Sequence, residues 1–167
     1  MASLPTERES DAAIAAFYRD HAAVVVVQQA VGALALVPFV LFGLSLGSGR
    51  LLKLAVGLLV AVELVTNAVP LLILALPGSA RSLTRIEDIA DNQLFVAITI
   101  FVLVATLDHP VRIKTAAYLV AFACVLRAWG LPGFNVVAPL AFLAFVLLLS
   151  LRQLLASRRQ AVANPAP

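Results

Sequence analysis

The chain has 167 residues, of which 62% are hydrophobic and 13% are charged, with a net charge of +3. A soluble domain of this length needs about a quarter charged residues to solvate its surface, so we expect lipid to replace much of the water here. The basic residues are scattered between apolar runs, and the lack of a basic patch disfavours nucleic-acid binding. A single cysteine, Cys124, excludes an internal disulfide.

Polar and mixed residues fill positions 1–21. Within them, Ile14, Phe17, Tyr18 and His21 share one helical face, which predicts an amphipathic lead-in helix lying in the membrane interface. No basic region precedes the first apolar run, so we do not expect a cleaved signal peptide.

Five apolar segments follow, at about 22–46, 51–76, 92–107, 111–129 and 133–151. Each approaches the ~20 residues that cross a bilayer as a helix. The third should begin earlier, because Thr84 and Glu87 have capping-box spacing after Leu83. The sequence therefore predicts an all-α transmembrane bundle of five helices over 22–155. A bundle of four crossings, with the fourth segment on the surface, stays open. Residues 156–167 should form a basic and then disordered tail.

The charges predict the orientation of the chain. With five crossings, one membrane face collects seven basic residues and the other collects five. The positive-inside rule then places the N-terminus outside and the C-terminus in the cytoplasm of a cell whose plasma membrane the protein crosses. The seven are Arg50, Lys53, Arg112, Lys114, Arg152, Arg158 and Arg159.

Glu63 is the only acid between Leu51 and Leu76, and it lies near the middle of that segment. A carboxylate at the bilayer centre costs roughly 2.5–3.5 kcal/mol, so it is rarely kept without a role. Thr66, Asn67 and Pro70 follow at positions i+3, i+4 and i+7, on the same helical face. Pro70 has no N–H and therefore leaves the carbonyl of Thr66 without its helical donor.

The predicted catalytic residues are Glu63 and Asn67. Glu63 should be largely protonated in hydrocarbon unless Arg127 reaches it, and a neutral acid can donate a proton. Other polar side chains should gather in the same half of the bundle and line a pocket, although interhelical hydrogen bonding would explain them equally well. These predicted substrate-binding residues are Gln28, Gln29, Thr66, Asn92, Gln93, Arg127 and Asn135.

An acidic cluster, Glu87, Asp88 and Asp91 followed by Asn92, has the i, i+4 spacing with which carboxylates can hold Mg²⁺. Solvated acids near a helix start explain the cluster more simply. We therefore expect no metal, with these three acids as weak candidates, and no cofactor. The sequence contains no Walker A, GxGxxG, HExxH, GxSxG or CxxC pattern.

The stretch from Asp11 to His21 (DAAIAAFYRDH), followed by a long apolar run, resembles the start of an uncharacterised bacterial family of small multi-pass membrane proteins. The stretch from Arg112 to Gly130 is similar to the penultimate helix of that family. The resemblance implies a membrane helix bundle and implies no activity.

These patterns predict a small integral membrane enzyme that binds an apolar isoprenoid- or lipid-like substrate around Glu63 and performs acid–base chemistry of the cyclase or isomerase type. Two alternatives stay open, namely a non-catalytic subunit or scaffold of a larger complex and a proton- or ion-coupled transporter. The expected partners are the lipid bilayer and an apolar small-molecule or lipid ligand. A homo-oligomer and a membrane-protein partner also stay open, and no nucleic acid is expected.

Overall fold

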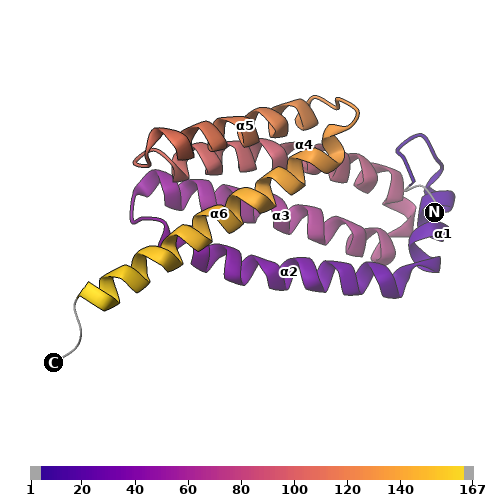
Figure 1. Cartoon of the computed structure of the whole chain (residues 1–167). Coiled ribbons are helices and arrows are strands. Elements are labelled where there is room, and N and C mark those ends of the chain that lie inside the picture. The colour runs from indigo at the N-terminus through magenta and orange to yellow at the C-terminus, as the bar shows by residue number, and fades with distance from the viewer. Residues whose placement is uncertain (1–4, 164–167) are drawn as a thin grey trace.

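The computed structural model describes residues 5–163, which form six α-helices and one short 3₁₀ helix and contain no strand. Figure 1 shows α2 to α5 side by side along one axis, with α6 crossing them obliquely. The predicted all-α bundle is therefore confirmed. The elements are α1 (Asp11–Asp20), α2 (Ala22–Ser45), α3 (Arg50–Ala75), η1 (Pro77–Ser79), α4 (Ala80–Ala105), α5 (Val111–Ala128) and α6 (Phe134–Ala163).

Four helices, α2, α3, α4 and α6, are long and apolar enough to cross a membrane. The fifth, α5, carries basic residues near both ends, yet it does not lie flat on the surface. It packs against α4 and α6 and buries Ala117, Val120 and Cys124. α5 is thus part of the bundle, although it is not among the four candidate membrane spans of the described residues, and α1 and the end of α6 lie at opposite ends of the bundle (Figure 1).

The main core is formed by buried side chains of α3, α4, α5 and α6, with partly buried side chains of α2 packed against it. Leu52, Val56 and Leu59 recur at helical spacing on α3 and face the completely buried Phe101 of α4. Gly43 of α2 lies so close that a Cβ atom there would stand 2.7 Å from Cγ2 of Val56. The core is thus built by close helix approach, as small residues permit in membrane bundles.

Three phenylalanines join α2, α4 and α6 inside this core. The ring of Phe39 lies 5.2 Å from that of Phe101 and 6.3 Å from that of Phe142, centroid to centroid. The rings of Phe101 and Phe142 meet edge to face at 6.2 Å. Such geometry suits aromatic pairs and holds the oblique α6 against the other helices.

A second core lies at what we call the α1 end of the bundle. Ile14 and Tyr18 of α1 are buried with Val69 and Ile73 of α3 and Ala80 of α4. This helical face therefore packs against protein, because η1 turns the chain so that α3 and α4 cover it, and the sequence did not indicate this contact. The amphipathic helix itself was predicted correctly.

The start of α4 also differs from the prediction. The helix begins at Ala80, and Thr84 donates its hydroxyl to the Ala80 carbonyl at 3.0 Å, so Thr84 is an interior residue and not a cap. A carboxylate of Asp11 instead accepts from the backbone N–H of Arg81 at 2.7 Å. A residue of α1 thus satisfies a first-turn donor of α4, and no local sequence pattern could reveal this.

The turn between α5 and α6 ends short of the neighbouring helices at the α1 end of the bundle, and α5, with 18 residues, is shorter than α2, α3 and α4. Its turn contains Gly130 and Gly133 with φ values of 75° and 91°, a conformation that favours glycine. Because Arg127 reaches Asn92, α5 ends level with that residue, and the first turns of α4 extend beyond the hairpin. At the other end α6 runs to Ala163, past the predicted limit at 155; residues 164–167 of the predicted disordered tail lie outside the described residues.

Candidate functional site

Glu63 lies on the inner face of α3, between the buried Leu59 and the buried Asn67, and its side chain is half-buried. The Asn67 amide donates to the Glu63 carboxyl at 3.1 Å and to the Glu63 carbonyl at 2.8 Å. Thr66 donates its hydroxyl to the same carbonyl at 2.9 Å. The i, i+3, i+4 spacing thus brings the predicted residues together within one helix turn, and the amide holds the carboxyl in place.

Gly32 of α2 makes room for this arrangement. A Cβ atom at Gly32 would overlap the side-chain oxygen of Asn67 and stand 3.2 Å from its Cγ. The missing side chain lets α2 approach α3 at the level of the buried amide. Sequence reasoning overlooked Gly32 because a glycine carries no chemistry of its own; the only available signal was a small residue inside a long apolar helix.

Arg127 and Asn92 form a second pair, between α5 and α4. The guanidinium donates to the Asn92 side-chain oxygen at 3.4 Å and lies over the Phe95 ring, 5.0 Å from its centroid. Asn92 and Glu63 each lie about 13 residues from the same end of the bundle, hence at about the same depth of ~20 Å. Among the described residues Glu63 has no basic group within 4.0 Å, so Arg127 does not neutralise it.

The depth of Asn92 corrects an expectation from the sequence. The apolar run begins at position 92, which indicated a place near the start of its helix, but α4 begins at Ala80, so Asn92 lies at mid-helix. The first turns of α4 are polar, so the apolar pattern of the sequence did not include them. They lie at the α1 end, where α1 and η1 cover part of them.

The acids of α4 meet a tyrosine. Tyr18 of α1 donates its hydroxyl to Glu87 at 3.0 Å, while Asp88 is exposed and Asp91 is half-buried. Among residues 5–163 no three acidic, histidine or cysteine side chains converge as metal ligands. The structure therefore gives Glu87 a role in holding α1 against α4.

The remaining predicted site residues do not join Glu63. Gln28, Gln93 and Asn135 are exposed, and Gln29 is half-buried. Gln93 borders an apolar groove of about 270 Å³ between α3 and α4, together with residues such as Val62 and Ile89. The predicted residues thus divide into two bonded groups and several surface side chains, and no single polar pocket gathers them all.

Among the described residues, four helices long and apolar enough to cross a membrane make the chain compatible with a multi-pass α-helical membrane protein. No protein-family model, curated protein or solved structure matches the chain.

Proposed function

We propose that this protein binds an apolar, lipid-like molecule within the membrane and that Glu63 exchanges a proton with it. One observation carries the proposal: a half-buried carboxyl near the middle of α3 is held by Asn67 at 3.1 Å and has no basic partner within 4.0 Å among the described residues. A carboxyl in such surroundings is most stable in its neutral form. A neutral acid can protonate an alkene or another weakly basic group.

Asn67 serves in this proposal as a positioning residue. Both hydrogen bonds of its amide go to Glu63, so it limits the rotamers of the acid without touching the reacting atoms. Along α2, Phe39 lies about two turns from Gly32, the residue that packs against Asn67, so its ring is about one turn from the depth of Glu63. Aromatic faces attract cations, which suits the isomerase- or cyclase-type chemistry of isoprenoids.

The experiment compares the wild type with Glu63→Gln and with Asp88→Asn, a matched acid-to-amide change at an exposed position. Each protein is purified in detergent for native mass spectrometry, and the lipids of the expressing cells are profiled. We expect the wild type and Asp88→Asn to carry the same apolar molecule and to form the same product. Glu63→Gln should keep the molecule and lose the product.

Two results would overturn this proposal. One is a wild type that carries no apolar molecule. The other is a Glu63→Gln variant that forms the wild-type product at the wild-type rate.

A non-catalytic subunit is the second candidate, and the hydrogen bonds of Glu63, Thr66 and Asn67 favour it because they are all internal to α3 and need no ligand. A stoichiometric protein partner in the same mass spectra, without a bound lipid, would support it. Proton-coupled transport has less support, because the core that separates Glu63 from the opposite end consists of apolar residues such as Val56 and Phe101.

A further inference from the structure

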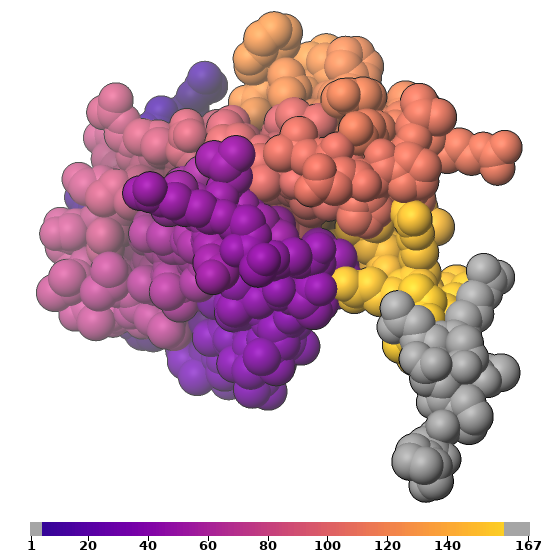
Figure 2. Space-filling model, turned by 90° about the vertical axis from the view of Figure 1, so that its left-hand side faces the viewer, coloured from indigo at the N-terminus to yellow at the C-terminus, as the bar shows by residue number. Residues whose placement is uncertain are grey.

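A cavity of about 430 Å³ lies at the end of the bundle opposite α1, far from Glu63. Its walls come from the α2–α3 connection with the first turn of α3, and from the end of α4 with the α4–α5 connection. Figure 2 looks onto this end, where the two connections lie beside each other. The residues that matter below are Leu46, Ser48, Arg50, Leu52, Leu107 and His109.

The charges around this cavity are mainly positive, so we call this the basic end. Arg50 and Lys53 lie in the first turns of α3, Arg112 and Lys114 in the first turn of α5, and Arg152 in α6. Asp108 is the acid among the cavity residues. Five cations around one acid give an electrostatic potential that attracts an anion.

The positive charges also act on His109, which lines the cavity. Burial lowers the pKa of His109, and the charges of Arg152 and Lys114 lower it further, against the opposing effect of Asp108. An imidazole surrounded in this way remains neutral at neutral pH and offers one N–H donor. The positive potential therefore comes from Arg152, Lys114 and Arg50.

Backbone donors add to these charges. Neither α3, which begins after Gly49, nor α5, which begins after Pro110, has a side-chain hydrogen bond at its N-cap. Arg50, Leu51 and Leu52 of the first turn of α3 line the cavity, and the free N–H groups of a first helical turn favour an anion.

The apolar part of the wall indicates what kind of anion fits. Leu46, Leu52 and Leu107 lie beside the polar groups, and the cavity lies where the apolar helices end, at the level of lipid head groups. We propose that this cavity binds the phosphate of an anionic phospholipid, with the glycerol and upper acyl carbons against the leucines. Basic pockets between membrane helices suit such head groups.

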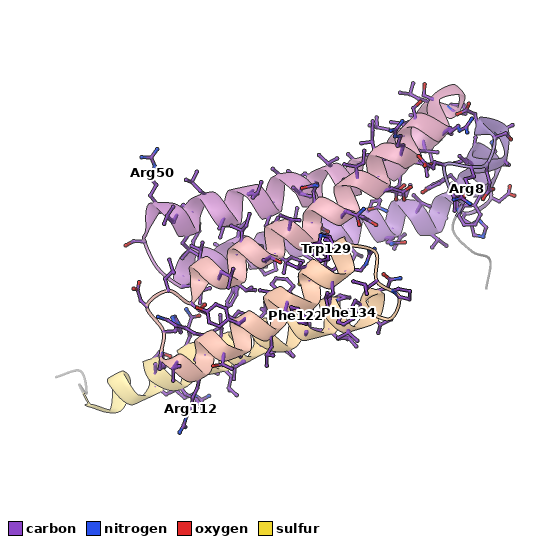
Figure 3. All side chains as sticks on the ribbon, turned by 90° about the horizontal axis from the view of Figure 1, so that it is seen from above. Arg8, Arg50, Arg112, Phe122, Trp129 and Phe134 are labelled. Carbon is purple, nitrogen blue, oxygen red and sulfur yellow. The ribbon has the colours of Figure 1, made fainter. Side chains whose placement is uncertain are left out.

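Arg50 would have to move to make this contact. Figure 3 shows its side chain extended away from the helices, as is that of Arg112. Arginine side chains are long and can rotate, and a guanidinium matches a phosphate with two parallel hydrogen bonds. Arg50 borders the cavity, whereas Lys53 and Arg112 do not, and this difference provides matched controls.

The test reconstitutes the full chain in phosphatidylcholine nanodiscs containing phosphatidylglycerol, and counts the lipids retained after transfer to detergent by native mass spectrometry. The wild type should retain phosphatidylglycerol in preference to phosphatidylcholine. The double variant that combines Arg50→Gln with His109→Asn should lower the retention of phosphatidylglycerol about fivefold or more, as expected for the loss of one cation near a membrane surface. Lys53→Gln and Arg112→Gln remove the same charge outside the cavity and should leave the retention within about twofold.

Equal losses in all variants would overturn the proposal, because diffuse surface charge would then explain the binding. A second arm offers inorganic phosphate without anionic lipid. Protection of the protein by phosphate, without retention of phosphatidylglycerol, would overturn the lipid as the source of the phosphate group. The thermal unfolding temperature of each variant, measured in the same detergent, shows whether a loss reflects unfolding.

Discussion

Gly32 and Asn67 meet where α2 packs against α3, and a Cβ atom on the glycine would overlap the oxygen of the amide. Asn67 is buried, and its nitrogen is already bonded twice to Glu63. The position of the carboxyl in α3 is therefore linked to the packing of α2 through one glycine.

Gly32→Ala should destabilise the protein by about 1–3 kcal/mol, because overpacking forces either the amide or the helix to shift. Gly57→Ala is the matched control. A Cβ atom there meets nothing within 4 Å, so this change should be neutral or stabilising by up to about 1 kcal/mol. Thermal unfolding in detergent compares the two, and equal stability of both variants would contradict the close contact.

Tyr18→Phe should loosen α1. The change removes the hydroxyl that bonds Glu87 at 3.0 Å and keeps the ring that is buried at the α1 end. A bond to a charged acceptor is worth about 1.5–3 kcal/mol, so amide hydrogen exchange in α1 should rise. Tyr118→Phe changes an exposed ring and should not affect α1. Unaltered protection of α1 in the first variant would argue against this anchor.

The same tyrosine should make the protein sensitive to alkali. Burial raises the pKa of Tyr18 above its usual range, and Glu87 raises it further through its charge and its hydrogen bond. The folded state thus holds the proton more tightly than the unfolded state, whose tyrosine ionises near pH ~10. This contribution to stability is complete below that pH and is lost as pH rises through the folded pKa. Unfolding followed from pH ~8 to 12 should show an alkaline decline that Tyr18→Phe lacks.

The orientation of the chain can be tested with single cysteines. Cys124 is completely buried, and Cys124→Ala provides the background. Arg8→Cys and Ser157→Cys then add one exposed thiol at each end of the bundle. An impermeant maleimide applied to intact cells should label the first, and should label the second only after lysis. Labelling of both in intact cells would refute five crossings, and the inverse pattern would refute the predicted orientation.

The helices were predictable because each long apolar run must become a helix in lipid, where backbone groups cannot bond to water. The Glu63–Asn67 bond was predictable too, since i, i+4 neighbours meet on any helix. The true start of α4 was not predictable, because its first turns are polar and the backbone N–H of Arg81 is bonded by the distant Asp11.

The prediction that the polar residues share one wider pocket did not hold for a different reason. Depth along a helix can be counted from a sequence, but the rotation of a helix about its axis depends on how all its neighbours pack. Gln28 and Asn135 lie in the expected half of the bundle but face outward. Asn92 and Arg127 do face inward, because a buried phenylalanine, Phe95, provides a surface on which the guanidinium lies.

The short α5 gives the molecule an apolar girdle of uneven height. The 18-residue α5 spans ~27 Å, whereas the 24-residue α2 spans ~36 Å. Trp129, 79% exposed at the hairpin turn, is placed to anchor that side at the water boundary (Figure 3). Lipids beside α5 must therefore shorten or tilt relative to those beside α2, which ties the stability of the protein to bilayer thickness.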